Sequence, residues 1–194
     1  MMPIMLAAAL SLAPLAPAFA DGERWEFRIS NEISPAEPTA RIELWAYFDP
    51  SDYAFARAGL DVLASEPGWV VGSLLEMGRG EGIGTTPGEI VGPNVLGIIA
   101  GQMNFSPVIA ADPSNPILVW EAEFATSDFQ PRTISLATQT EEFLAYLLYG
   151  VMLSESRIAS LTEGSGEITV IPAPGALAVG AGAMWVACLR RRRR

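Results

Sequence analysis

The sequence contains no lysine and no histidine, and Cys188 is its only cysteine. Histidine is the usual general base near neutral pH and a common metal ligand, so its absence excludes histidine-based triads and histidine-based metal centres. Because lysine is absent, catalysis through a lysine Schiff base is excluded as well. A single cysteine cannot form a disulfide within the chain, so a folded domain must be held together by packing alone.

Positive charge is scarce everywhere except in the last five residues. All 22 acidic residues lie between Asp21 and Glu167, where seven arginines occur, and 7 − 22 gives this part a net charge of −15. Binding to nucleic acid requires a basic face, so nucleic acid is excluded as a partner. An anionic polysaccharide would also be repelled unless divalent cations bridged it to the protein.

Catalytic motifs are missing too: the sequence has no nucleophile elbow, no phosphate-binding loop and no metal-binding pattern. Glu121 and Glu123 would point to the same side of a strand, about 7 Å apart, a separation similar to that of paired hydrolase carboxylates. Alternating acids on a solvated sheet face are the ordinary explanation of such a pair. We therefore predict a protein that is not an enzyme and that binds no cofactor.

An apolar stretch is present at the start of the chain. It runs from Ile4 to Leu15 and is followed by Ala-Phe-Ala at residues 18–20, a small-x-small cleavage site before Asp21. Three prolines within residues 1–20 keep the stretch below membrane-spanning length. We predict a secretory signal peptide over residues 1–20, cleaved after Ala20.

A second apolar stretch lies at the end of the chain, after Pro172, Ala173 and Pro174. The two prolines end the preceding strand, because each fixes φ and lacks an amide donor. The uncharged run 175–189 would span only about 22 Å as a helix, against the ~30 Å of a bilayer core. The residues that follow the run are Arg190, Arg191, Arg192, Arg193 and Arg194. By the positive-inside rule, this arginine block stays in the cytoplasm and the rest of the protein lies outside.

The order of a Pro-x-Pro motif, an apolar helix and an arginine block resembles the PEP-CTERM sorting signal of Gram-negative bacteria that produce exopolysaccharide. Ala173 stands where that family has glutamate, and the sequence Pro-Ala-Pro-Gly-Ala-Leu-Ala resembles a planctomycete-type variant. The resemblance covers residues 172–194, and it implies that an exosortase, a membrane protease, recognises and cuts the chain. A plain tail anchor is the alternative.

Residues 21–171 have the length of one domain. The stretches 24–29 and 41–48 alternate polar and apolar residues, the pattern of half-buried strands, and turn sequences rich in proline, glycine and aspartate separate such stretches. Further strands are expected at 53–63, 97–105, 116–125, 132–140, 143–149 and 166–171. Seven or eight short strands with little helical periodicity predict a mainly β fold, an antiparallel β-sandwich of the immunoglobulin-like kind.

The run 41–65 also resembles the middle of uncharacterised PEP-CTERM proteins of planctomycete type, and its general pattern resembles cohesin-like sandwiches. Helix is expected to be minor, with candidates at Asp52–Ala58 and Ser154–Leu161. The glycine- and proline-rich residues 77–93 are expected to form a long loop. The side chains predicted to face inward are Trp25, Phe27, Leu44, Phe48, Leu118, Trp120, Phe124, Ile134, Leu136, Ile168 and Val170.

Two features of the predicted domain are candidate binding sites. Trp45 and Tyr47 would share the outer side of their strand about 7 Å apart, which suits a platform for sugar rings unless a neighbouring loop half-buries both. Oxygen ligands suited to calcium occur in turn sequences, at Asp49, Asp52, Asp112, Asn115 and Asp128. Their spacing matches neither an EF-hand nor an RTX repeat. The ordinary interpretation is turn formation, and a calcium site at Asp49, Asp52 and Asp112 is the alternative.

The two end signals predict an exported structural protein, held transiently in the inner membrane and then delivered to the cell envelope or to an extracellular exopolysaccharide matrix. Its expected partners are the exosortase, the membrane through the C-terminal helix, and exopolysaccharide. The alternative function is that of a carbohydrate-binding module that uses the aromatic face of Trp45 and Tyr47.

Overall fold

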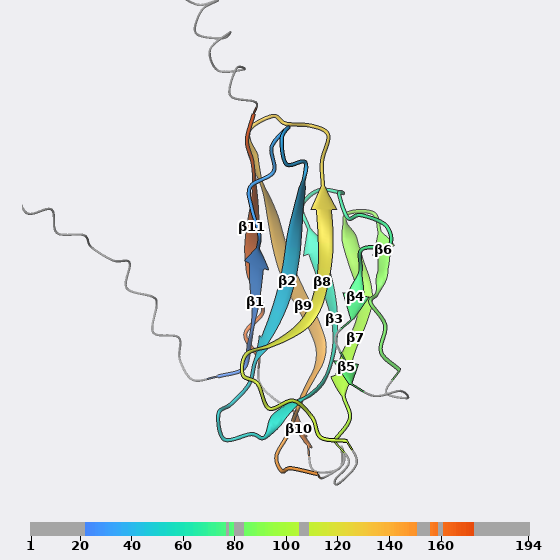
Figure 1. Cartoon of the computed structure of the whole chain (residues 1–194), viewed down its shortest axis with the longest axis vertical. Helices are drawn as coiled ribbons and strands as arrows, with labels where there is room; N and C mark the ends of the chain where they lie inside the picture. Colours follow the sequence, from blue (N-terminus) through green and yellow to red (C-terminus); the bar gives the residue numbers. More distant parts are fainter. Residues whose placement is uncertain are drawn as a thin grey trace, which may run out of the picture.

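A computed structural model describes residues 22–76, 78–79, 84–104, 109–150, 156–158 and 161–172. These residues form two packed β-sheets (Figure 1). The expected signal peptide and the C-terminal signal from Ala173 onward, including the run 175–189 and the arginine block, lie outside the described residues. Within the described part, no helix is long and apolar enough to cross a membrane.

The first sheet, here called sheet A, contains four strands in the order β1-β2-β8-β4, and each neighbouring pair is antiparallel. Its strands are β1 (Arg24–Ile29), β2 (Thr39–Tyr47), β8 (Ile117–Ala125) and β4 (Leu75–Glu76). In β2 the apolar residues at even positions, from Ala40 to Ala46, are buried, while the intervening side chains point outward. The period of two expected from the sequence is therefore what sets this strand's inner face.

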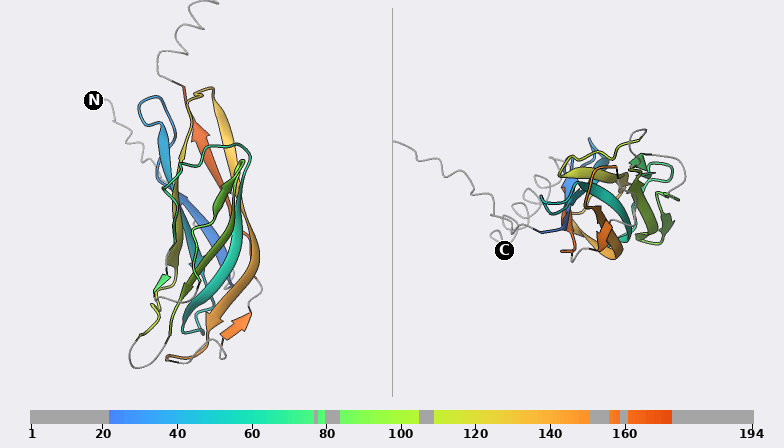
Figure 2. Two further views of the ribbon diagram at one scale, coloured as in Figure 1. Left: turned by 90° about the vertical axis from the view of Figure 1, so that its right-hand side faces the viewer. Right: turned by 90° about the horizontal axis from the view of Figure 1, so that it is seen from below.

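The second sheet, sheet B, contains seven strands: β10-β9-β3-β7-β5 in order, with β11 beside β9 and β6 beside β7. Its strands are β3 (Ala54–Ala64), β5 (Gly78–Arg79), β6 (Glu89–Val91), β7 (Asn94–Gln102), β9 (Arg132–Tyr146), β10 (Ser156–Ile158) and β11 (Ser165–Val170). The strands of both sheets run along the long axis of the molecule (Figure 2). The predicted antiparallel β-sandwich is confirmed, with β5 added in parallel to β7.

A cluster of aromatic rings fills the core beside β8. Trp120 is fully buried, as predicted, and its ring centroid lies 5.6 Å from that of Trp69. The ring centroid of Phe124 lies 5.1 Å from that of Trp69, so Trp69 contacts both of the other rings. The indole N–H of Trp120 donates to the Pro87 carbonyl at 3.0 Å, and that of Trp69 donates to the Pro93 carbonyl at 2.8 Å. Sequence patterning missed Trp69, because it lies outside any alternating stretch.

The two sheets are joined along one edge, where β1 lies beside β11 (Figure 1). The amide of Ile33 donates to Thr169 at 2.9 Å, and the amide of Ile171 donates back to Ile33 at 2.9 Å. Glycine is required at this edge, because a Cβ built on Gly166 would lie 2.9 Å from the Cβ of Phe27. The close approach of β11 to β1 therefore depends on the missing side chain.

The helix expected at Asp52–Ala58 is wrong, because β3 begins at Ala54. Ala54, Phe55, Ala56 and Ala58 are buried, and β3 pairs with β9 on one side and β7 on the other. Pairing on both sides of a central strand outweighs the local helix signal. Asp52 lies in the preceding turn, where its amide donates to Asp49 O at 2.9 Å.

The helix expected at Ser154–Leu161 is also wrong where the structure describes it, since Ser156–Ile158 form β10 against β9. The two strands expected at 132–140 and 143–149 are one strand, β9, because β3 pairs with it from Leu136 to Tyr146 and so spans the expected break. Strands β5 and β6 lie within the expected loop 77–93, part of which is outside the described residues.

Leu118 does not face inward, whereas the other predicted inward residues lie in the core or pack against it. The register between β2 and β8 shifts at this point: Leu44 is opposite Trp120, but Trp45 is opposite Leu118. This β-bulge inserts Val119, which is buried, and places Leu118 on the same outer side as Trp45. A strict period of two could not have revealed the inserted residue.

We predict that Gly166→Ala lowers the free energy of unfolding by about 1–3 kcal/mol, because the new methyl group is forced against Phe27. Gly59→Ala is the matched control, since a Cβ at Gly59 meets nothing within 4 Å. The control should be neutral or slightly stabilising. Denaturant titration of the purified proteins measures both changes, and equal stabilities would contradict the close packing of β11 on β1.

We predict that Trp120→Ala costs about 3–5 kcal/mol of unfolding free energy, because it empties a large buried site and leaves the Pro87 carbonyl without its donor. Trp45→Ala on the outer face is the control for loss of an indole, and it should cost only about 1 kcal/mol. Thermal and denaturant unfolding give both values. A Trp120→Ala protein as stable as the parent would mean that the inward and outward faces of β8 are wrongly assigned.

Candidate functional site

The outer face of sheet A carries the aromatic pair found in the sequence. Arg41, Glu43, Trp45 and Tyr47 alternate with the buried residues of β2, and their side chains leave the sheet on its outer side. Trp45 and Tyr47 are both half-buried. The predicted position of this pair is confirmed, whereas its binding of sugar stays a prediction.

Arginines of β1 cover the two aromatic rings. The guanidinium carbon of Arg28 lies 4.2 Å from the ring centroid of Trp45, and that of Arg24 lies 3.6 Å from the ring centroid of Tyr47. Arg28 also donates to the Tyr47 hydroxyl at 3.2 Å. Side chains of the neighbouring strand thus partly cover both rings. Sequence analysis missed these two arginines. The signal that could have found them is the alternation of Arg24, Glu26 and Arg28 on one side of β1, which pairs with β2 along its whole length.

Charged contacts continue from the aromatic pair across β2 to β8. The indole N–H of Trp45 donates to a Glu43 carboxylate oxygen at 2.9 Å, and the other Glu43 oxygen lies 3.2 Å from Arg41 Nη2. Arg41 also forms an ion pair with Glu121 of β8. These contacts make one connected network of side chains that lies on the outer surface of three strands.

Contacts within the network change the pKa values of Glu26 and Arg41. Partial burial would raise the pKa of Glu26, but hydrogen bonds from Arg28 and Tyr47, with the charges of Arg28 and Arg24, outweigh burial and lower this pKa. The hydrogen bond and the charge of Glu121 raise the pKa of Arg41. Both shifts favour the charged forms, so the ion pairs persist at neutral pH.

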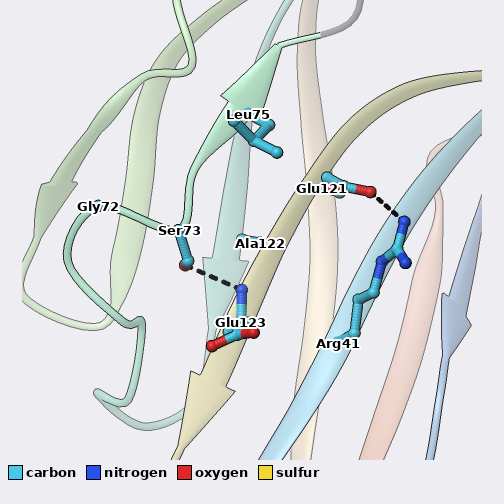
Figure 3. Close-up of a pocket in the computed structure, with 7 residues that line it drawn as sticks. All are labelled: Arg41, Gly72, Ser73, Leu75, Glu121, Ala122 and Glu123. Carbon is cyan, nitrogen blue, oxygen red and sulfur yellow. Dashed lines mark hydrogen bonds and ion pairs between the residues drawn. The ribbon is translucent and has the colours of Figure 1, made fainter.

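A shallow hollow of about 280 Å³ adjoins the network at Arg41 (Figure 3). The segment 72–75 forms its far wall, with Ser73 and Leu75 facing Glu121 and Glu123 of β8. The hydroxyl of Ser73 accepts a hydrogen bond from the backbone amide of Glu123 at 3.0 Å, which fixes this wall against the sheet. The hollow therefore contains a guanidinium, two carboxylates, a hydroxyl and an apolar side chain.

The carboxylates considered as a hydrolase pair lie in this hollow in unlike surroundings. Glu121 is engaged by Arg41, whereas Glu123 is exposed. One carboxylate of the pair is thus held in an ion pair between β2 and β8, a contact typical of charged residues on a solvated sheet face.

The candidate calcium ligands lie in turns, as the ordinary interpretation expected. Asp49 accepts from the amide and hydroxyl of Ser51 at 2.8 and 2.7 Å, and Asp112 accepts from those of Ser114 at 2.9 and 2.6 Å. Asn115 donates to the Phe48 carbonyl at 2.6 Å and so joins the two turns. Asp128 follows the other end of β8. Within the described residues, no group of three or more acids or other typical ligands is arranged to hold a metal ion.

The sorting residues are described only at their start. Ile171 is bonded through its amide to the rim of the sandwich, and Pro172 is the last described residue. Ala173, Pro174, Cys188 and the arginine block lie outside the described residues.

No family model matches the chain, and no curated protein sequence matches it. Among solved structures, it is similar to the cohesin module of a family 33 glycoside hydrolase from Clostridium perfringens, with a TM-score of 0.45, 9% identity, and coverage of 79% of this chain and 100% of that chain. A type I cohesin, the seventh of ScaB from Pseudobacteroides cellulosolvens, gives a TM-score of 0.45, 12% identity and coverage of 77% and 93%. The sixth cohesin of scaffoldin B from Acetivibrio cellulolyticus, solved in complex with a Cel5 dockerin, gives 0.41, 9%, and coverage of 74% and 96%. The similarity is one of sandwich architecture alone.

We predict that Arg28→Gln raises the pKa of Glu26, because it removes a charged hydrogen-bond donor from that carboxylate. A depressed carboxyl pKa contributes stability above the unfolded-state value, near pH 4, and this contribution is lost as the pH falls through the folded-state pKa. The variant should therefore lose less stability on acidification than the parent does. Carbon-detected NMR titration of Glu26 measures the shift. Arg41→Gln is the control, and an equal change of the Glu26 pKa in both variants would contradict the assignment.

Proposed function

We propose that this chain is a non-enzymatic structural protein of the cell surface or the exopolysaccharide matrix, exported through residues 1–20 and sorted through residues 172–194. The observation that carries the proposal is the order of Pro-x-Pro motif, apolar run and arginine block at the end of a domain without lysine, histidine or disulfide. The fold supports it, because β11 ends at Val170, directly before the motif. The sandwich and the sorting signal thus occupy separate parts of the chain.

In this proposal the arginine block keeps the C-terminus in the cytoplasm while the sandwich lies outside. The run 175–189 holds the protein in the inner membrane until an exosortase cuts near the proline motif. The released domain then enters the envelope or the matrix. Its net charge of −15 keeps it soluble there.

We predict that the surface-extracted protein lacks both Met1–Ala20 and Arg190–Arg194. Intact-mass measurement of the protein from the producing cell checks both ends in one experiment. A variant with the five arginines replaced by glutamine should stay in the membrane fraction or lose its orientation, because the positive charge that fixes the cytoplasmic side is gone. A surface-extracted protein that retains all five arginines would exclude processing and favour a plain tail anchor.

A second function, carbohydrate binding, is favoured by the position of Trp45 and Tyr47 on the outer face of sheet A. Aromatic rings of this kind present an apolar surface to a sugar ring while their polar edges stay hydrated. A polysaccharide affinity gel that retards the parent and not Trp45→Ala supports this function. Equal retardation of the two proteins would exclude it.

A further inference from the structure

The outer face of sheet A is nearly neutral, although the domain is strongly acidic. Three arginines and four glutamates project from it, whereas residues 21–171 as a whole carry −15. These residues are Arg24, Arg28 and Arg41 with Glu26, Glu43, Glu121 and Glu123. The negative charge of the whole domain repels an anionic partner and does not repel an uncharged one.

Two of these arginines are already engaged by neighbouring side chains. Arg28 donates to Glu26 at 2.7 Å and to the Tyr47 hydroxyl, and Arg41 is shared between Glu43 and Glu121. An anionic polymer would compete with these carboxylates and would also be repelled by the net charge of the domain. Both ion pairs of Arg41 use Nη2, so a ligand hydroxyl can accept from another N–H of this half-exposed guanidinium. The face therefore suits an uncharged chain better than a polyuronate.

The chemical groups on this face form a bent strip. From Tyr47 through Trp45 and Glu43 to Arg41, the outward residues of β2 extend over about 20 Å. The hollow lies to the side of Arg41, over β8 and the segment 72–75. Aromatic rings stand at one end. Donors, acceptors and the apolar side chain of Leu75 stand at the other (Figure 3).

We propose that this strip binds an uncharged, extended glycan chain that follows β2 and then crosses β8 into the hollow. Sugar rings contact the parts of Trp45 and Tyr47 that the arginines of β1 leave exposed. The hydroxyl groups of a further sugar enter the hollow, where they donate to Glu121 and Glu123 and accept from Arg41. The inference rests on the carbohydrate-binding function proposed above, and it extends that site from the aromatic pair to the hollow. It also fixes the class of glycan as neutral.

A glycan fits the hollow better than a protein surface does. Glutamate and aspartate are depleted in the cores of protein interfaces, because burying a carboxylate without donors is costly. Glu121 already has Arg41 as its partner, so a ligand that covers the hollow must supply a donor to Glu123. Sugar hydroxyls do so at closely spaced positions, while the C–H faces of the same ring contact Leu75.

The test is affinity electrophoresis of the full-length chain, solubilised in detergent, through gels that contain hydroxyethyl cellulose, galactomannan or polygalacturonate. Retardation is expected in at least one of the two neutral gels and not in polygalacturonate. Trp45→Ala and Tyr47→Ala should weaken binding by about tenfold. Leu75→Asp and Glu123→Ala, in the hollow, should each weaken it by about fivefold.

Tyr149→Ala is the matched control. Tyr149 is an exposed tyrosine in the turn after β9, 55% accessible, and it lies outside the strip. Its removal should leave retardation unchanged. Circular dichroism of each variant shows whether the sandwich is intact, and the exposed position of Glu123 makes its variant the least disruptive of the set.

The outcomes separate this inference from the functions on which it depends. If Trp45→Ala weakens binding while Leu75→Asp and Glu123→Ala do not, a carbohydrate site exists at the aromatic pair and the inference about the hollow is wrong. Preferential retardation by polygalacturonate overturns the assignment to neutral glycans. If no gel retards the parent, both the inference and the carbohydrate-binding function fail, and a protein partner for this face becomes the better explanation.

Discussion

Three buried indole rings join parts of the sandwich that no disulfide connects. Trp25 of sheet A donates to the Thr140 hydroxyl of sheet B at 2.8 Å, while Trp69 and Trp120 donate to the carbonyls of Pro93 and Pro87. Each ring thus contributes apolar area to the core and one hydrogen bond to a distant segment. A buried indole whose N–H lacks a partner would be destabilising, so the position of each ring constrains the loop or strand opposite it.

The apolar interior determines which residues of sheet A lie on its outer face. Because the inward positions of β1, β2 and β8 are taken by apolar side chains, the charged residues of the same strands all lie on one surface. Antiparallel pairing places Arg24 opposite Tyr47, Arg28 opposite Glu43 and Arg41 opposite Glu123. Glu43 and Glu121 are opposite each other, and the guanidinium of Arg41 forms an ion pair with both of them. Strand pairing thus brings the arginines and the carboxylates of this face into contact.

The sequence predicts those parts of the structure that depend on local alternation. The bounds of β1 and the outward position of Trp45 and Tyr47 follow from a period of two, and both are found. Features that depend on pairing partners are not predictable in this way. The N-terminal half of β3 has a helix-like sequence but lies between β7 and β9, and the bulge at Val119 exists only in relation to β2. The hollow at Arg41 was not predicted because its far wall, residues 72–75, carries no periodic pattern.

The direction of β2 relates the candidate glycan site to the proposed mode of display. The strands run along the long axis, and the chain leaves the sandwich after β11 at one end of that axis (Figure 1). The part of the strip that follows β2 therefore lies on the side of the molecule, parallel to the axis, and not at the end from which the chain leaves. A domain held by its C-terminus would present this side to a chain passing alongside it, and release by cleavage would leave the strip unchanged. The proposed glycan strip and the proposed sorting signal thus use different residues of the chain.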